Sequence, residues 1–258
     1  MSDDPLPPPS PTPAPGRATA RTAAVIPAAG RGVRLGPGAP KALRALGGTP
    51  MLVHAVRAMA DSRAVSLVIV VAPPDGAPEV KSLLDAHALP DRTDFLVVPG
   101  GESRQESVKR GLDALPPGYD IVLVHDAARP LVPVDTVDAV IEAVRDGAPA
   151  VVPALPLADT VKRVEPAAVP GEPEPVVATP DRSLLRAVQT PQGFDRDTLV
   201  RAHETVKDDV TDDASMVEQL GLTVVTVPGH EEAFKVTRPL DMVLAEAVLA
   251  RRRLNDGF

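Results

Sequence analysis

The sequence contains no cysteine and no tryptophan, and only one tyrosine and four phenylalanines among 258 residues. Without cysteine there is no disulfide framework, no thiolate nucleophile and no cysteine-ligated metal site. No apolar run approaches the roughly 18 residues needed to cross a bilayer, and the N-terminus lacks the charged-then-apolar order of a secretory signal. These absences predict a cytoplasmic protein that uses neither cysteine chemistry nor a membrane.

Basic residues are also in the minority. The chain has 27 Lys and Arg against 35 Asp and Glu, a net charge of -8. This balance argues against general nucleic-acid binding, so cations that gather in particular loops are better explained as local anion sites. An apolar content of 44% is normal for a globular core, and the length suffices for one large α/β domain or two small ones. We expect the partner to be a small anion.

The first 21 residues differ from the rest. Seven prolines fall between Pro5 and Pro15, in a mixture that buries little apolar area. Residues 1–21 are therefore predicted to be a disordered tail without a part in the chemistry, followed by a single domain over residues 22–254. A second proline-rich stretch, Glu165 to Pro180, predicts a long exposed excursion from that domain.

Strand-like and helix-like segments alternate along the domain. Short runs rich in Val, Ile and Leu have the length of buried strands: Ala23–Ile26, Leu67–Ala72, Phe95–Val98, Ile121–His125, Ala150–Ala154 and Thr223–Val227. Helical patterns follow at Thr49–Ala60, Ser103–Leu115, Pro133–Arg145, Arg196–Val206, Asp212–Leu220 and Pro239–Arg253. The alternation predicts an α/β fold, a mostly parallel sheet with helices on both faces and ligands at the carboxyl ends of the strands.

The loop after the first strand, Pro27 to Lys41, reads PAAGRGVRLGPGAPK. Its glycines let a ligand approach the backbone, and its cations can neutralise a polyphosphate. It is not a P-loop, because GxxxxGK followed by Ser or Thr is absent. Arg34 and Lys41 stand seven residues apart and could hold a triphosphate from two sides, with Arg31 a bystander. The alternative is a flexible basic surface loop.

The loop after the third strand, Pro99 to Ser107, brings two glycines to the start of a helix. Its backbone could read the edge of a base, so Ser107 and the Gly100–Gly101 backbone are ligand candidates. Ser103 and Glu106 match a capping box, and we interpret them as structural. Thr49 is likewise expected to cap its helix, with Pro50 at the first helical position.

Two further groups of polar residues lie at strand ends. Asp126 and Arg129 could hold a polyol hydroxyl and a phosphate, or could simply pair with each other. His125 is expected to be a packed strand residue rather than a base. Thr211 and Thr237 read as helix N-caps, with Asp212 and Asp213 complementing the helix dipole. Lys235 has no evident structural task, which makes it a binding candidate.

Taken together, these segments resemble the family of 2-C-methyl-D-erythritol 4-phosphate cytidylyltransferases of the non-mevalonate isoprenoid pathway. The matching motifs, in order, are PAAGRGVRLGPGAPK, GGESRQESV, VHDAARP, DTVKR, TPQ, TDDAS and KVTRP. The resemblance runs from about Ala24 to about Leu249. It implies a Rossmann-like nucleotidyltransferase fold with a projecting β-arm, at about residues 158–190, through which two subunits form a homodimer. It also implies that CTP and methylerythritol phosphate are joined with a divalent cation, usually Mg²⁺.

The resemblance also implies roles for individual residues. Arg34 and Lys41 match stabilisers of the transition state, and Lys235 lies close enough to assist them. The cytidine pocket is matched by Ala28, Ala29, Gly30, Gly101, Glu102 and Ser107. The methylerythritol phosphate site is matched by Asp126, Arg129, Thr160, Thr211 and Lys235, and by Arg182 reaching across from the neighbouring subunit. No protein ligand to the metal is named, because the phosphates of CTP are expected to hold it.

Glu165 to Pro180 departs from the family, being longer and richer in proline than the usual arm hairpin. One alternative is a ribitol 5-phosphate cytidylyltransferase, which shares the fold and CTP but resembles HDAARP, TDDAS and KVTRP less closely. A catalytically silent nucleotide-binding protein is disfavoured because Arg34, Lys41 and Lys235 are all present. A fusion to a second pathway enzyme is not expected, because only residues 250–258 follow the matching region.

Overall fold

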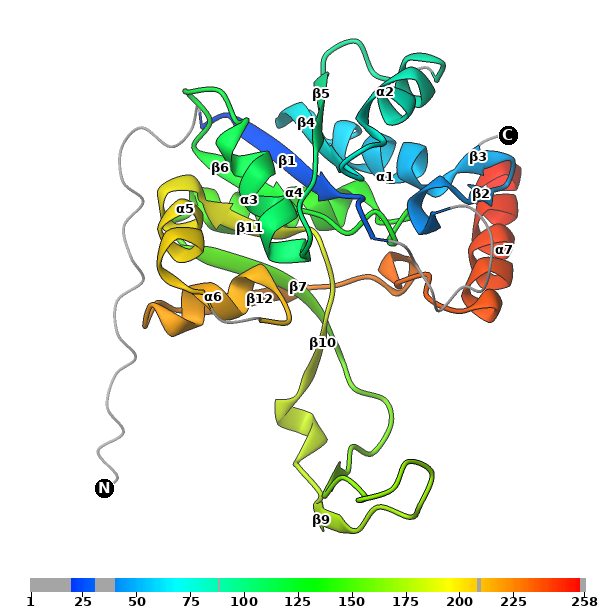
Figure 1. Ribbon diagram of the computed structural model, residues 1–258, viewed down its shortest axis with the longest axis vertical. Helices are drawn as coiled ribbons and strands as arrows, with labels where there is room; N and C mark the ends of the chain where they lie inside the picture. Colours follow the sequence, from blue (N-terminus) through cyan, green and yellow to red (C-terminus); the bar gives the residue numbers. More distant parts are fainter. Residues whose placement is uncertain (1–19, 31–39, 88, 208–209, 256–258) are drawn as a thin grey trace, which may run out of the picture.

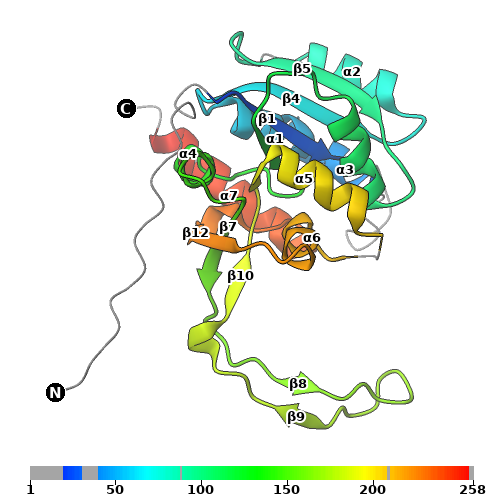
Figure 2. The ribbon, with the colours of Figure 1, turned by 90° about the vertical axis from the view of Figure 1, so that its left-hand side faces the viewer.

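The computed structural model describes residues 20–30, 40–87, 89–207 and 210–255. It has one body built on a sheet with helices around it, and a long arm that projects from the body (Figures 1 and 2). Most of the predicted N-terminal tail lies outside the described residues. No helix within the described ranges is long and apolar enough to span a membrane.

Every apolar run expected to be a strand is one. The strands are β1 (Thr22–Pro27), β4 (Val65–Ala72), β5 (Asp94–Pro99), β6 (Ile121–Val124), β7 (Ala150–Pro156) and β12 (Val224–Pro228). Within the sheet, β5, β4, β1 and β6 are parallel neighbours, and β12 runs parallel to β7. The prediction of a mostly parallel sheet is confirmed.

Two strands that the sequence did not predict complete this sheet. They are β10 (Arg186–Val188), antiparallel to β7, and β11 (Gln192–Asp195), antiparallel to both β6 and β7. Strand β11 has one large apolar residue, Phe194, which is fully buried. A Cβ on its Gly193 would lie 2.4 Å from Val140, so glycine here permits close packing of a helix on the sheet.

Helices cover both faces of the sheet. They are α1 (Met51–Ala60), α2 (Ala77–Asp85), α3 (Arg104–Asp113), α4 (Val134–Arg145), α5 (Arg196–Thr205) and α6 (Asp213–Gln219), whereas α7 (Pro239–Asn255) packs beside the sheet in a separate apolar cluster with Leu46 and Leu131. Along β1, Ala24 and Ile26 join the core formed with α1, α2 and α4, whereas Ala23 and Val25 join the core formed with α3, α5 and α6. This alternation is the two-residue period of a strand buried on both faces.

Several helix starts differ from the prediction. Thr49 does not cap α1, because Thr49–Pro50 form the short strand β3, paired with β2 (Ala45–Leu46), and the helix begins at Met51. Thr211 does not cap α6. The neighbouring Asp212 does, with its carboxylate accepting the Ser215 N–H at 3.0 Å.

Thr237 also has a different role, since its N–H and hydroxyl donate to Asp241 at 2.7 and 2.9 Å in the first turn of α7. When two adjacent residues could each cap a helix, the N-cap is the one that directly precedes the first helical residue. Tertiary packing determines which residue is the first.

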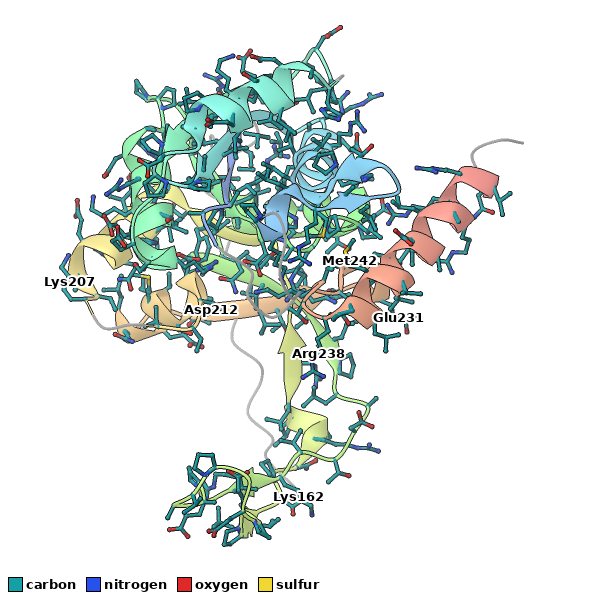
Figure 3. All side chains as sticks on the ribbon, turned by 45° about the vertical axis from the view of Figure 1, so that its right-hand side comes forward. Lys162, Lys207, Asp212, Glu231, Arg238 and Met242 are labelled. Atoms are coloured by element: carbon teal, nitrogen blue, oxygen red, sulfur yellow. The ribbon has the colours of Figure 1, made fainter. Side chains whose placement is uncertain are left out.

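The arm leaves the body after β7 and returns through β10 (Figure 2). It carries the hairpin β8 (Arg163–Val164) and β9 (Val176–Ala178) and the 3-10 turn η4 (Arg182–Leu184). Lys162 marks its outer part, well away from the body (Figure 3). Residues 165–180 are almost all exposed, which confirms the predicted excursion.

Candidate active site

A cavity of about 240 Å³ opens at the carboxyl ends of β1 and β6. Because β1, β4 and β6 are parallel, the loops that follow them meet at one edge of the sheet. Nine residues predicted from the sequence line this cavity: Ala28, Ala29, Gly30, Lys41, Gly101, Glu102, Ser107, Asp126 and Lys235. Ser103, Arg104, Ala42, Ala127, Ala128 and Pro27 complete the described lining.

The loop after β5 is packed tightly against the end of β4. The Gly100 N–H donates to the Ala72 carbonyl at 2.7 Å. A Cβ on Gly100 would lie 2.8 Å from that carbonyl oxygen, so only glycine fits without a shift of the loop. Next to it, the Ser107 hydroxyl accepts the Gly101 N–H at 3.1 Å and donates to the Ser103 carbonyl at 2.9 Å. The buried Ser107 hydroxyl therefore stabilises the conformation of this loop through two hydrogen bonds.

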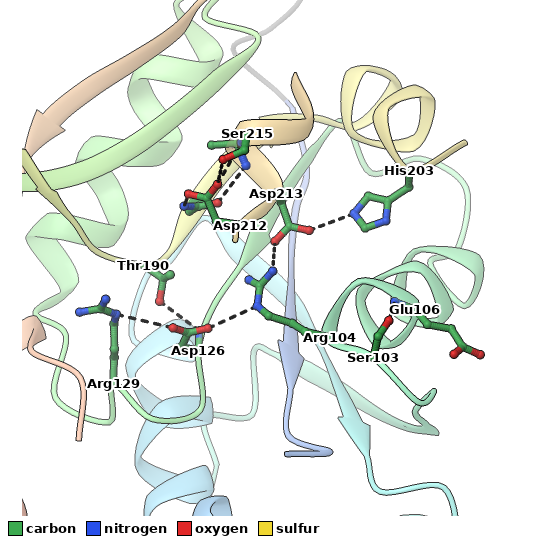
Figure 4. A network of polar contacts seen from close by, with 12 residues as sticks. Ser103, Arg104, Glu106, Asp126, Arg129, Thr190, His203, Asp212, Asp213 and Ser215 are labelled. Atoms are coloured by element: carbon green, nitrogen blue, oxygen red, sulfur yellow. Dashed lines mark hydrogen bonds and ion pairs between the residues drawn. The ribbon is translucent and has the colours of Figure 1, made fainter. Parts of the chain in front are cut away.

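Asp126, just after β6, is surrounded by cations (Figure 4). Its Oδ2 lies 2.8 Å from Lys235 Nζ and 3.8 Å from Arg129 Nε, and its Oδ1 lies 3.8 Å from Arg104 Nε. Burial alone would raise the pKa of Asp126, but Lys235, Arg104 and Arg129 outweigh burial and lower the pKa to about 2. The carboxylate is therefore ionised at neutral pH and holds Lys235 at the cavity.

Arg129 does contact Asp126, which favours the pairing alternative, but most of its donors go elsewhere. Its guanidinium donates to the carbonyl oxygens of Ala233 at 2.7 Å and Val188 at 3.2 Å. Ala233 ends the 3-10 turn η5 (Glu231–Ala233), two residues before Lys235, and Val188 ends the arm strand β10. Arg129 is not part of the described lining of the cavity. Its contacts connect Asp126 to the segment that carries Lys235 and to the base of the arm.

Arg104, which the sequence reasoning missed, connects the cavity to a buried, hydrogen-bonded Asp213–His203 pair (Figure 4). Its Nη1 lies 2.7 Å from Asp213 Oδ2, and Asp213 Oδ1 lies 2.9 Å from His203 Nε2. Asp213 and His203 are both buried. Burial would raise the pKa of Asp213, but the hydrogen bond with His203 and the charge of Arg104 lower it. Asp213 thus fixes Arg104 from the side away from the cavity.

One sequence signal could have indicated Arg104. It is the first residue of α3, where a cation opposes the helix dipole. A cation placed against the dipole, directly after a glycine-rich loop that faces a ligand site, implies a task outside the helix. For its partner Asp213, the sequence indicates only that the carboxylate complements the dipole of α6, not that it contacts Arg104.

His125 is a packed strand-end residue, as expected. It is fully buried, with Nδ1 3.1 Å from Thr190 Oγ1 and Nε2 3.1 Å from the Arg129 carbonyl. Burial lowers the pKa of His125 to about 4, although Asp126 beside it acts in the opposite direction. Thr190 also accepts the Asp126 N–H at 3.0 Å. A neutral His125 therefore helps to position Asp126 through Thr190.

Three further predicted residues, Thr160, Arg182 and Thr211, lie apart from the cavity. Thr160 and Arg182 are exposed on the arm, where Arg182 donates to the Ala158 carbonyl. Thr211 is exposed just before α6. Arg34, and Arg31 with it, lies outside the described residues. Within the part of the chain that is described, no three Asp, Glu or His side chains are placed to hold a metal ion.

Known proteins resemble this chain over nearly its whole length. The sequence model of a family described as 2-C-methyl-D-erythritol 4-phosphate cytidylyltransferase matches residues 22–251. A protein of that description from Streptomyces avermitilis is 88% identical over 258 residues, all of both chains. Another from Streptomyces coelicolor is 89% identical over 243 residues, 94% of this chain and 90% of the relative.

Solved structures agree with this likeness. The 4-diphosphocytidyl-2C-methyl-D-erythritol synthase of Anaerococcus prevotii superposes with a TM-score of 0.76 at 27% identity, over 90% of this chain and 97% of that one. The 2-C-methyl-D-erythritol 4-phosphate cytidylyltransferase of Thermus thermophilus gives a TM-score of 0.67 at 35% identity, over 87% and 97%.

Proposed function

Because the chain belongs to the 2-C-methyl-D-erythritol 4-phosphate cytidylyltransferase family, we propose how the residues around its cavity divide the work of that reaction. The enzyme joins CTP and 2-C-methyl-D-erythritol 4-phosphate, gives 4-diphosphocytidyl-2-C-methyl-D-erythritol and releases pyrophosphate, a step in isoprenoid precursor synthesis. The observation that carries the proposal is one cavity at which Lys41, the Asp126–Lys235 pair and the glycine-rich loops meet.

The chemistry is an in-line displacement at phosphorus. An oxygen of the methylerythritol phosphate attacks the α-phosphorus of CTP, and the bond from that phosphorus to the bridging oxygen of the β-phosphate breaks. Pyrophosphate leaves with the electron pair, and no covalent enzyme intermediate is needed. The protein has to align the two substrates and neutralise the charge that develops. Cations fixed around the cavity suit this task.

Lys41 and Lys235 approach the proposed reaction centre from different segments. Lys41 lies at the start of the 3-10 turn η3 (Lys41–Leu43) and is proposed to contact the departing phosphates. Arg34, outside the described residues, is proposed for the same role. Lys235 is held at 2.8 Å by Asp126. An ammonium has three donors, so Lys235 can bond Asp126 and still donate to a phosphate oxygen.

The nucleotide and the second substrate are proposed to occupy different sides of the cavity. Ala28, Ala29 and Gly30 follow directly after β1, and they are proposed to hold cytidine together with Gly101, Glu102 and Ser107. Asp126, Arg129, Thr160, Arg182, Thr211 and Lys235 are proposed to serve methylerythritol phosphate. Of these, Asp126 and Lys235 line the cavity, Arg129 is proposed to position Asp126, and the other three lie outside the lining of their own chain's cavity. Arg104 is an addition to this set, because it lines the cavity and is fixed by Asp213.

We propose a homodimer in which each arm contributes to the partner's site. Thr160 and Arg182 lie on the arm, away from the cavity of their own chain. The arm also exposes apolar side chains, including Leu184, which is 81% exposed, and Val176 and Val169. Exposed apolar groups of this kind mark interaction surfaces. A second copy that covers them would bring Arg182 to the substrate.

Mg²⁺ is proposed as the divalent cation, arriving with CTP. Of the described residues that line the cavity, only Glu102 and Asp126 carry carboxylates, and Asp126 already faces three cations. Protein sites of this type bind Mg²⁺ through one or two carboxylates together with substrate phosphates. The cavity therefore fits a cation held chiefly by the nucleotide, where it would neutralise phosphate charge.

Pyrophosphate release by the purified chain tests this function. The assay contains methylerythritol phosphate, Mg²⁺ and one of CTP, UTP, ATP or GTP. We expect release to depend on both substrates and to be fastest with CTP. Binding of CTP with no release of pyrophosphate would instead support a catalytically silent nucleotide-binding protein.

A further inference from the structure

We propose that Glu106 and Arg110, both outside the cavity lining, set the selectivity for cytosine by fixing which backbone groups of the Gly100–Glu102 loop can face a base. The inference rests on the nucleotide site proposed above. Both residues are on α3, one turn apart, and both contact the loop that precedes this helix.

Glu106 departs from the capping box that its sequence predicts. In a capping box the carboxylate at the third helical position accepts the N–H of the N-cap residue. Here Ser103 is the N-cap and accepts the Glu106 N–H at 3.0 Å, as expected. The Glu106 carboxylate instead accepts the N–H of Glu102 at 2.9 Å, one residue earlier and outside the helix. Glu106 therefore shapes the loop rather than completing the cap.

Arg110 stabilises this arrangement with two hydrogen bonds, one to Glu106 and one to the loop. Its Nη2 donates to Glu106 Oε1 at 2.7 Å, and its Nη1 donates to the Gly100 carbonyl at 2.5 Å. The hydrogen bonds from Glu102 and Arg110 also lower the pKa of Glu106, so its carboxylate stays ionised. The loop lies directly on this pair, since a Cβ on Gly101 would come within 2.3 Å of Glu106 Cδ. The contact needs glycine at that position.

All three N–H groups of the loop are satisfied inside the protein. Gly100 donates to Ala72, Gly101 donates to Ser107 Oγ, and Glu102 donates to Glu106. The Gly100 carbonyl is occupied by Arg110. The backbone groups that remain on Gly101 and Glu102 are carbonyl oxygens, which only accept hydrogen bonds. A base edge that meets this loop must therefore donate.

Cytosine and uracil differ at two neighbouring positions on the pyrimidine edge. At C4 cytosine has an amino donor and uracil a carbonyl acceptor, and at N3 cytosine has an acceptor and uracil an N–H donor; the group proposed to meet the loop is the one at C4. A loop that offers only acceptors favours the amino group and leaves the uracil oxygen unpaired. Sites built to bond one polar group discriminate strongly against an analogue that lacks it. If Glu106 is removed, the Glu102 N–H loses its acceptor and can turn to the uracil oxygen.

The test is the ratio of kcat/KM for UTP to kcat/KM for CTP in single variants. We expect Glu106→Ala to raise this ratio about tenfold, the scale of one or two hydrogen bonds. Arg110→Ala should raise it in the same direction. Glu106→Gln keeps an oxygen that can accept the Glu102 N–H, so it should restore most of the selectivity.

The same helix offers a matched control. Lys109 and Asp113 form another salt bridge between residues four apart, at 2.9 Å, with side chains 44% and 62% exposed against 44% for Arg110 and 42% for Glu106. Lys109→Ala should leave the UTP to CTP ratio unchanged, because the hydrogen bonds between these two side chains lie on the helix and do not involve the Gly100–Glu102 loop.

Three outcomes would overturn the proposal. The first is an unchanged ratio in both Glu106→Ala and Arg110→Ala. The second is the same rise in Lys109→Ala. The third is an equal gain for ATP and GTP, which would mean a loosened cavity rather than an exposed donor. Activity of the wild-type chain with CTP is measured in the same series, so a failure of the proposed function is seen separately.

Discussion

Lys235 Nζ lies 2.8 Å from Asp126 Oδ2, and this ion pair joins the end of β6 to the segment that leads into α7. Asp126 is further enclosed by Arg104 and Arg129, while Lys235 remains 41% exposed at the cavity. The pair fixes a cation beside the nucleotide loops without burying its charge. We propose that Lys235, held in this way, neutralises phosphate charge during the transfer of the cytidylyl group from CTP to methylerythritol phosphate.

The first prediction concerns the cations proposed to stabilise the transition state. Lys41→Ala and Arg34→Ala should each lower kcat by about 10²-fold or more, the effect of losing one preorganised donor. Steady-state kinetics with both substrates measure this. Arg31→Ala, in the same loop, is the control and should change kcat little. An effect of Lys41→Ala confined to KM would contradict the role.

The second prediction tests the contribution of the arm. If Arg182 acts in the partner's site, a heterodimer of one Arg182→Ala subunit and one Lys41→Ala subunit contains one site with both residues intact. Such heterodimers, purified with two different tags, should recover up to about half of the wild-type activity, whereas each variant homodimer stays low. No recovery in verified heterodimers would count against a shared site.

The third prediction concerns the support behind Arg104. Asp213→Asn removes the negative charge that holds the Arg104 guanidinium, so we expect weaker substrate binding as well as a loss of stability on the order of 3 kcal/mol. Kinetics and denaturant unfolding measure the two effects. Asp212→Asn, next in sequence, keeps a side-chain oxygen that can cap α6 and removes a carboxylate charge that acts on Arg104 only through the electric field, so it should change substrate binding and stability less than Asp213→Asn. Equal kinetic effects in the two variants would argue against this role for Asp213.

The fourth prediction is a dependence of stability on pH. The folded pKa of His125 is about 4, below the ordinary value of 6.5. Between these pH values the unfolded chain binds a proton that the folded chain does not, so stability falls as the pH is lowered through this window. From pH 7 to pH 5 this loss is about 2 kcal/mol.

His125→Gln cannot titrate, so its unfolding free energy should fall less over the same interval by about this amount. Denaturant unfolding at the two pH values gives the comparison. Parallel losses in the wild type and the variant would show that His125 is not the group responsible.

The core strands and the general place of the site could be predicted because they follow from local patterns. Ala23–Ile26 and Ile121–His125 are continuous apolar runs, and loops that follow parallel strands meet at one edge. Strand β11 could not be found this way, since Gln192–Asp195 has one large apolar residue and is a strand only through its neighbours β6 and β7.

The supporting contacts of the site depend on tertiary structure. Arg104 and Asp213 are 109 residues apart, and Asp126 and Thr190 are 64 apart. No periodicity in the sequence connects such residues. Local spacing can also mislead within a few residues. The spacing of Glu106 from Ser103 predicts a capping box, but the Glu106 carboxylate accepts the N–H of Glu102 instead, because the glycines before the helix let the loop approach it.

This cavity is proposed as the place where the cytidylyl group passes from CTP to methylerythritol phosphate. The most direct measurement is one reaction with CTP, Mg²⁺ and equal amounts of methylerythritol 4-phosphate and ribitol 5-phosphate, with the products separated and identified by mass spectrometry. We expect 4-diphosphocytidyl-2-C-methyl-D-erythritol as the main product, together with an equal amount of pyrophosphate. Formation of the ribitol product in its place, or no cytidylyl product at all, would rule out this function.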